Sequence, residues 1–457
     1  MRRTRAQVIT QLVAPLFAFA LLTVTHPIAQ AETASPASPF RDFTPLFNGK
    51  DLTGWWGEGT TDPKTYLKLD PDALAQRKKA SIEDPKNGIK AHWSVQDGEL
   101  VNDGHGHYLT TDRNYGDFEL LLEYRTVPKA DSGVYLRGIP QVQIWDYTEE
   151  AKFKIGGDKG SGGLWNNSPG APGKDPLVRA DQPLGQWNRM RIVMVGEFVT
   201  VQLNDKLVVD HARMENYFNR KEPMPKAGPI QLQTHGGEIR WRNIQVREIT
   251  GDEANAILRS GGPDKPAAAL RSLFNGKDLT GWKGPVDNYE VREGAIACKP
   301  GKGGTIYYDE EFADFHARLE FRLPPGGNNG LAIRYPGNGD AAYAGLCELQ
   351  VLDDNYEALR GKIDPRQAHG SVYGMVAAAR GYQRPIGEWN FQDVFVQGSH
   401  VRVVLNGYRI LDADVSKVKE FMGGKPHPGL TRTQGYFGFA GHSDPVAFRN
   451  IEVKPLP

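Results

Sequence analysis

The chain has 457 residues, with 55 Lys and Arg against 55 Asp and Glu, so its formal net charge is zero. Nucleic-acid binding needs a basic surface, so this balance argues against that class of protein. Two cysteines in a chain of this length exclude a disulfide scaffold and a cysteine-ligated zinc framework. The 52 glycines, 31 prolines and plentiful aromatic residues favour many turns and short strands over helices.

The first residues have the pattern of an export signal. Three arginines among the first five residues precede an apolar stretch at 12–24, and residues 29–31 (Ala-Gln-Ala) fit a small-x-small cleavage site. We therefore predict a signal peptide over 1–31 and a flexible leader over 32–39. Pro15 interrupts the apolar stretch, which is short for a membrane span, and no later stretch is longer. The mature protein is expected in the periplasm or outside the cell, without a membrane span.

The rest of the chain is an internal duplication. The ten residues 46–55 (LFNGKDLTGW) recur unchanged at 273–282, and further shared motifs follow in the same order. Because this order holds over about 200 residues, each copy is a whole domain rather than a short repeat. The predicted organisation is a first domain at 40–250, a linker at 251–269 and a second domain at 270–457.

Within each copy the hydrophobic pattern has a period of two residues. Strand-like runs occupy 118–125, 191–195, 199–203 and 401–405, and Gly- and Asn-containing turns separate such runs. Many short strands at this spacing predict an all-β fold, with an antiparallel two-sheet sandwich or jelly roll in each copy. The first copy carries an insertion at 62–88, which is expected to form a short surface helix covering one edge of a site.

Strand alternation predicts which polar side chains share a face. In the first copy this outward set is Tyr135, Arg137, Gln141, Gln143, Trp145, Gln231, Gln233 and His235. In the second copy the corresponding set is Arg334, Glu348, Gln350 and His442. Amides, arginine, imidazole and aromatic rings suit a sugar, since hydroxyls need donors and acceptors and apolar ring faces stack on aromatics. The solvated face of any sandwich is also polar, so a purely structural role is the alternative to a sugar-binding groove.

For several other repeated residues the sequence also fits a purely structural role. Asp146 and Asp353 end their strands and fit either a catalytic carboxylate or a turn cap. The repeated Asn-Gly-Lys-Asp segments at 48–51 and 275–278 are typical of turns. The arginine of each Arg-Asn-Ile segment is expected to make a structural ion pair.

Five ordered motifs together resemble the 3-keto-disaccharide hydrolase domain. They are LFNGKDLTGW, a Ser/Asn-Gly-x-x-x-Arg strand, Glu/Gln-x-Gln-x-x-Asp, Gly-Glu/Gln-Trp-Asn, and a late His followed by Arg-Asn-Ile. The resemblance covers both copies. It implies two concanavalin-like jelly rolls in tandem, related in shape to laminarinases. It also implies cleavage of glycosides already oxidised at C3, by hydrolysis or by elimination followed by hydration.

This chemistry assigns roles to the outward residues. A C3 ketone acidifies the hydrogen on C2, so a base, a donor at the enolate oxygen and a proton donor for the leaving group are needed. In the second copy we expect Glu348 or Asp353 as the base, Arg334 at the enolate and His442 as proton donor or second base. In the first copy the corresponding set is Arg137, Gln143, Asp146 and His235. Gln141 stands there in place of Glu348, which weakens the case for catalysis by that copy.

The remaining outward residues are expected to bind the substrate, a glycoside or oligosaccharide. Amides would bind hydroxyl groups and aromatic rings would stack on the sugar; these residues are Gln141, Gln143, Gln233, Gln350, Tyr135, Trp145, Trp165 and Tyr373.

Two other functions compete with this reading. The spacing Glu348-x-Gln350-x-x-Asp353 matches the acid motif of laminarinase-like retaining glycosidases, whose two carboxyl groups lie about 5–5.5 Å apart. A tandem carbohydrate-binding protein without catalysis is the second alternative, in which duplication would increase avidity.

No cofactor is predicted from the sequence, although Asp-rich loops are compatible with a divalent cation such as Ca²⁺. There is no dinucleotide-binding fingerprint, so oxidation at C3 would fall to a separate sugar 3-dehydrogenase. Cys298 and Cys347 both lie in the second copy, and the sequence leaves open whether they form a disulfide.

Overall fold

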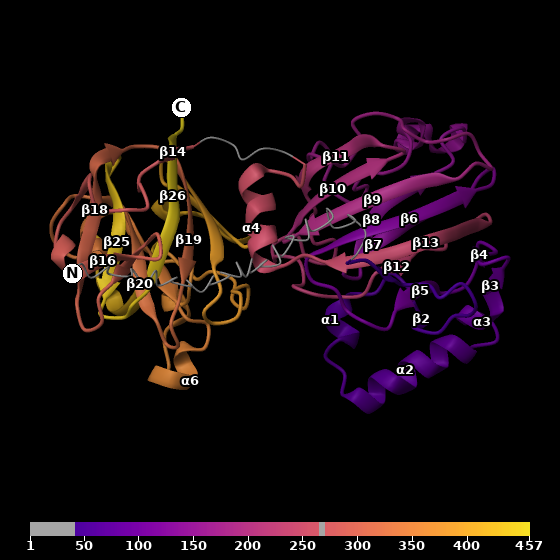
Figure 1. Cartoon of the computed structure of the whole chain (residues 1–457), viewed down its shortest axis with the longest axis horizontal. Helices are drawn as coiled ribbons and strands as arrows, with labels where there is room; N and C mark the ends of the chain where they lie inside the picture. Colours follow the sequence, from indigo (N-terminus) through magenta and orange to yellow (C-terminus); the bar gives the residue numbers. More distant parts are fainter. Residues whose placement is uncertain (1–41, 265–269) are drawn as a thin grey trace, which may run out of the picture. The chain divides into compact units, whose positions relative to one another are not determined.

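The computed structural model describes residues 42–264 and 270–457, which form two antiparallel β-sandwiches (Figure 1). The predicted signal and leader at 1–39 lie outside these residues. Within the described ranges, no helix is both long and apolar enough to cross a membrane.

The first sandwich pairs a large sheet with a small one. The large sheet has the order β11 (Lys206–Arg213), β10 (Phe198–Leu203), β9 (Asn188–Val195), β6 (Phe118–Thr126), β13 (Ile239–Glu248), β4 (Glu99–Asn102), β3 (Trp93–Gln96), with β1 (Thr44–Pro45) beside β13. The small sheet has the order β2 (Trp55–Glu58), β5 (Tyr108–Thr111), β12 (Gln231–Leu232), β7 (Asp131–Leu136), β8 (Ile139–Trp145).

The second sandwich repeats this topology strand for strand. Its large sheet has the order β24 (Tyr408–Asp414), β23 (His400–Leu405), β22 (Asn390–Gln397), β19 (Phe315–Arg322), β26 (Ala447–Pro455), β17 (Ala295–Cys298), β16 (Tyr289–Arg292), with β14 (Arg271–Ser272) beside β26. Its small sheet has the order β15 (Trp282–Lys283), β18 (Gly303–Phe312), β25 (Gly435–His442), β20 (Asn328–Tyr335), β21 (Cys347–Leu352). The predicted all-β fold with two sandwich domains is confirmed.

The described residues contain few helices, and most of these are short. They are α1 (Pro63–Tyr66), α2 (Pro71–Glu83), α3 (Ile89–His92), α4 (Gly251–Ser260), α5 (Ala341–Ala344) and α6 (Tyr356–Arg360), together with 3₁₀ helices at 150–155, 157–159, 286–288, 365–367, 415–417 and 422–424.

Two of these helices lie in segments that the sequence singled out. The insertion at 62–88 contains α1 and α2, and Arg77 of α2 pairs with Glu58 at 2.7 Å on the edge strand β2 of the small sheet. The segment expected as a linker begins with α4, which is capped at its start by the hydroxyl of Thr250 and ends at Ser260, with Gly261 as its C-cap. Residues 265–269 lie outside the described part of the chain.

Each sandwich has its own apolar core, built as alternation predicts. In the first copy Val142 and Ile144 of β8 are fully buried, and Leu349 and Val351 of β21 occupy the same positions in the second. The polar residues between them, such as Gln143, therefore project from the opposite face of each small sheet.

The repeated motifs hold the fold together. Asn48 accepts hydrogen bonds from the backbone N–H groups of Lys50 and Asp51, so this segment is a turn as expected, and 275–278 repeats it. The tryptophan of Gly-Glu/Gln-Trp-Asn lies under the arginine of Arg-Asn-Ile in each copy: Arg242 is 4.0 Å from the Trp187 ring centre and Arg449 is 4.1 Å from that of Trp389.

Arg137 and Arg334 were expected to stabilise an enolate, and the structure corrects this. Both have left-handed backbones, with φ of 55° and 48°, next to bulges where strand alternation breaks. Their side chains are therefore buried. Arg334 donates to the backbone carbonyls of Ala313, Gly398 and Arg432 and to the Asp314 carboxylate, each at 2.8 Å.

Arg137 makes the corresponding contacts to backbone carbonyls and a carboxylate in the first copy. It donates to the carbonyls of Gly116, Gly196 and Pro225 and to the carboxylate of Asp117. Because every guanidinium nitrogen already donates to protein, both arginines are structural residues.

Asp146 and Asp353 are turn caps, which corrects their expected catalytic role. Each is 2% exposed. Asp353 accepts from the N–H groups of Gly326 at 2.8 Å and Asn355 at 2.9 Å. Asp146 accepts in the same way from Lys129 and Thr148, so both oxygens of each carboxylate are occupied.

We expect Arg334→Leu to lower the free energy of unfolding by about 3–5 kcal/mol, because it leaves buried acceptors without a donor. Arg292→Leu is the matched control, since Arg292 is exposed and its pair with Glu290 at 3.6 Å contributes at most about 1 kcal/mol. Chemical denaturation of both variants measures the difference, and equal losses would contradict a structural role for Arg334.

Candidate active site

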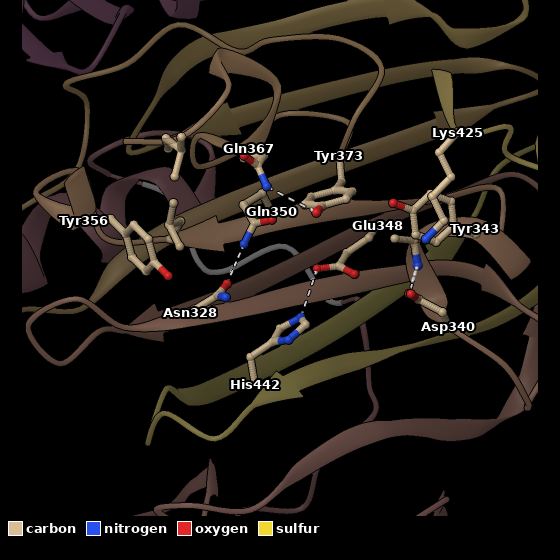
Figure 2. Close-up of a pocket in the computed structure, with 13 residues that line it drawn as sticks. Asn328, Asp340, Tyr343, Glu348, Gln350, Tyr356, Gln367, Tyr373, Lys425 and His442 are labelled. Carbon is tan, nitrogen blue, oxygen red and sulfur yellow. Dashed lines mark hydrogen bonds and ion pairs between the residues drawn. The ribbon is translucent and has the colours of Figure 1, made fainter. Parts of the chain in front are cut away.

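A cavity of about 350 Å³ opens on the outer face of the small sheet in the second sandwich (Figure 2). This volume lies within the range of about 300–1,000 Å³ typical of small-molecule sites. Its lining is largely polar and aromatic: Asn328, Asp340, Ala342, Tyr343, Glu348, Gln350, Leu352, Tyr356, Ile363, Gln367, Tyr373, Lys425 and His442.

A buried carboxylate and an imidazole meet in this cavity. Glu348 projects from β21 and is 3% exposed, whereas His442, at the end of β25, has a side chain that is 48% exposed. His442 Nε2 lies 3.7 Å from Glu348 Oε1, which is an ion-pair distance and too long for a hydrogen bond (Figure 2).

Both Glu348 and His442 have a raised pKa in this arrangement. Burial raises the pKa of Glu348, and His442 only partly opposes the rise. The Glu348 carboxylate in turn raises the pKa of His442. A carboxylate with a raised pKa is a stronger base than a solvated one, which suits proton abstraction.

A glycine makes room for the buried carboxylate. Gly330 of β20 lies on the strand next to β21, and a Cβ atom at this position would fall 2.0 Å from Glu348 Oε1. Only glycine therefore lets the Glu348 side chain lie across the neighbouring strand, which explains the glycine in the Ser/Asn-Gly motif.

Amides and hydroxyls surround the pair in fixed orientations. Gln350 donates to the Asn328 side chain at 2.6 Å and to the Asn329 carbonyl at 3.1 Å. Gln367 donates to the Tyr373 hydroxyl at 3.2 Å, which leaves that hydroxyl free to donate its own hydrogen into the cavity (Figure 2).

Beside Tyr373 the cavity wall carries a second aromatic ring and a cation. Tyr343 lies on α5, and Lys425 Nζ is 3.5 Å from the centre of its ring. Asp340 caps the same helix by accepting from the backbone of Ala342 (Figure 2). The cavity thus offers a base, a cation, several donors and ring faces.

Four residues predicted from the sequence meet in this cavity: Glu348, Gln350, Tyr373 and His442. Sequence reasoning missed Asn328, Asp340, Tyr343 and Lys425. Alternation could have found Asn328, which lies two residues before Gly330 on the same strand. The other three lie outside the five shared motifs, so no repeated pattern marked them.

The predicted residues of the first copy lie on the equivalent face and are mostly buried. Gln141 donates to Gln143, and the Tyr135 hydroxyl lies 2.8 Å from Thr60 Oγ1. Gln233 donates to Tyr135. His235 is exposed at the end of this set.

The two tryptophans of the first copy pack against each other. The ring centres of Trp145 and Trp165 are 5.9 Å apart, edge to face, and Trp145 is 5% exposed. Trp165 donates its indole N–H to the carbonyl of Ile155. Because Trp145 is covered, Trp165 is the better placed of the two to meet a ligand.

Metal-binding groups do not cluster in the described ranges: no three His, Cys, Asp or Glu side chains there could hold an ion together. The divalent cation considered from the sequence remains a prediction. Cys298 and Cys347 are buried free thiols, so they form no disulfide in this structure.

We expect Glu348→Gln to lower the pKa of His442, because the substitution removes the negative charge that raises it. Fewer His442 side chains would then be protonated at neutral pH. NMR titration of the imidazole signals measures this shift. His427, which binds the carbonyl of Ala342 instead, is the internal control and should keep its titration curve. An unchanged His442 curve would contradict the coupling.

Comparison with known proteins agrees with the geometry. The model of the 3-keto-alpha-glucoside-1,2-lyase-like domain matches residues 42–247 and again 269–454. A 3-keto-disaccharide hydrolase from Bacteroides thetaiotaomicron is 27% identical over an alignment of 226 residues, which covers 40% of this chain and 78% of that protein.

Solved structures include two of a candidate glycosyl hydrolase from Parabacteroides distasonis, each 26% identical to this chain. One alignment covers 40% of this chain and 93% of that structure with a TM-score of 0.35, and the other covers 41% and 100% with a TM-score of 0.37. Since the family model matches most of the sequence in two successive copies, this chain belongs to the 3-keto-alpha-glucoside-1,2-lyase-like domain family.

Proposed function

We propose that this protein cleaves the glycosidic bond of 3-keto glycosides in the cavity of its second sandwich. The observation that carries the proposal is the buried Glu348, a carboxylate with a raised pKa facing His442 inside a polar cavity. The family match and the name of the Bacteroides relative support the same substrate class.

The chemistry follows from the acidity of C2. Glu348 takes the C2 proton, and the electron pair of the C–H bond moves onto the C3 oxygen as an enolate. When the ketone reforms, a double bond forms between C1 and C2 and the C1–O bond breaks. Water then adds its oxygen to C1, and C2 regains a proton. The sum of both steps is hydrolysis.

The other cavity residues take the remaining roles. Lys425 is the cation available to the enolate oxygen, in place of the buried Arg334. His442, whose pKa is raised, and the Tyr373 hydroxyl are donors for the departing oxygen. Gln350 and Asn328 would bind hydroxyl groups, and the Tyr343 ring would stack on the sugar.

Two conditions accompany this function. The protein itself would not oxidise C3, so a separate sugar 3-dehydrogenase supplies the substrate. Export to the periplasm or beyond, inferred from residues 1–31, would place the enzyme where glycosides enter the cell.

The laminarinase-like mechanism needs two catalytic carboxylates, and the second of them is not available here. It required Asp353 as partner of Glu348, and both oxygens of Asp353 are bound to backbone N–H groups. A binding protein without turnover remains the other outcome of the experiment below.

We expect turnover of 4-nitrophenyl 3-keto-α-glucoside but not of the unoxidised 4-nitrophenyl α-glucoside, which lacks the acidic C2 hydrogen. At about pH 5, where unperturbed imidazoles are protonated, Glu348→Gln should lower kcat/KM by about 10²–10⁴-fold. The wild-type rate should rise with pH through a pKa above that of an ordinary glutamate, because Glu348 must be ionised to act.

Glu290→Gln is the control, since Glu290 lies on the large sheet and does not line the cavity. Release of nitrophenolate measures all rates. Binding of the keto glycoside without release would favour the carbohydrate-binding alternative and contradict the proposal.

A further inference from the structure

Both copies have a histidine at the same place near the end of the domain, His235 in the first and His442 in the second. On two neighbouring strands of the small sheet, however, the acid and the amide have changed places between the copies. Gly133 faces Gln143 across β7 and β8, and Gly330 faces Gln350 across β20 and β21. These two pairs show which positions of the first copy correspond to which positions of the second. Two positions before each glycine, the first copy has Asp131 and the second has Asn328. Conversely, the first copy has Gln141 where the second has Glu348.

Asp131 is therefore the carboxylate of the first copy. It is 8% exposed, and one oxygen accepts from Gln143 at 2.8 Å, as Asn328 accepts from Gln350. The other oxygen lies 3.0 Å from Lys152 Nζ and 3.2 Å from His235 Nδ1. Each copy thus brings one buried carboxylate beside its late histidine.

The exposure and the charges differ between the two pairs. The His235 side chain is 62% exposed, and because Nδ1 faces Asp131, Nε2 is the nitrogen available to a ligand. Asp131 raises the pKa of His235, while Lys152, itself paired with Glu149, opposes the rise. Burial would raise the pKa of Asp131, but His235 and Lys152 outweigh it and lower that pKa.

Two buried amides on the same face have an oxygen without a hydrogen-bond partner. The Oε1 atoms of Gln231 and Gln233 accept no hydrogen bond, although the two residues are 0% and 5% exposed. Gln231 faces Tyr135 in the strand register, and Gln233 donates to the Tyr135 hydroxyl, so both belong to the outward face of the small sheet. An unpaired buried acceptor costs about 1–3 kcal/mol, which a ligand hydroxyl could recover.

We propose that the first sandwich is a second catalytic site for the same class of keto glycosides, in which His235 Nε2 is the base and Asp131 is a positioning residue. This inference rests on the function proposed above. His235 takes the C2 proton and becomes an imidazolium beside Asp131. The electron pair forms the C1–C2 double bond as the C1–O bond breaks, and the departing oxygen takes a proton from water.

The two sites use different bases. Glu348 becomes a base once it ionises, above the pKa of an ordinary glutamate, whereas His235 becomes one only after losing its proton, above the pKa of an ordinary histidine. A single substitution at Glu348 would silence the second sandwich and leave the first to be measured alone.

The test compares release of nitrophenolate from 4-nitrophenyl 3-keto-α-glucoside by Glu348→Gln with and without a second substitution. At about pH 8, Glu348→Gln should keep on the order of a tenth or more of the wild-type rate, because general-base loss affects one site only. Adding His235→Ala should lower that remaining rate by about 10²–10⁴-fold. His235 is exposed, so this variant should fold.

The double variant Glu348→Gln with Asp131→Asn should lose its remaining rate only at a lower pH than Glu348→Gln alone. The reason is that the substitution removes the negative charge that raises the pKa of His235. Asp158 is an exposed acid of the same sandwich, so Asp158→Asn should not change the pH at which the remaining rate is lost. No remaining rate in Glu348→Gln at any pH would overturn this inference but not the proposed function. No turnover by the wild-type protein would overturn both.

Discussion

A carboxylate held out of water beside an imidazole is the interaction on which the second sandwich depends for any chemistry. Moving a carboxylate from water into protein costs several kcal/mol unless it is neutralised or paired. Glu348 meets this cost in part through His442 and in part by a raised pKa. Gly330 supplies the space for the side chain, and Gln350 fixes the adjacent amide of Asn328. The base is therefore positioned by strands, the most rigid elements available.

Most residues of the motifs that identify the family stabilise the fold. Arg334 closes one end of the sandwich by binding three backbone carbonyls, and Asp353 caps a turn. Trp389 stacks under Arg449. Their recurrence in both copies is explained by the fold, which needs them at the same places. Positions 131 and 141 of the first copy carry other residues than their counterparts 328 and 348, and all four lie on the outer face of a small sheet.

Sequence periodicity was sufficient for the fold and for part of the site. Alternation correctly placed Glu348 and Gln350 on the face opposite Leu349 and Val351, because β21 is regular. It failed at Arg334, where a left-handed residue beside a bulge turns the side chain inward. Lys425 and Tyr343 could not be found this way, since they come from a loop and a short helix whose positions depend on tertiary packing.

The central claim, that the buried carboxylate removes the C2 hydrogen, is tested most directly by isotope exchange. The enzyme is run in D₂O on a 3-keto disaccharide, and the released keto sugar is analysed at the first turnovers, with the free sugar incubated alone to correct for spontaneous exchange. Proton abstraction by Glu348 predicts deuterium at C2 of the product. A product that keeps its original hydrogen at C2 would show direct hydrolysis and contradict the account.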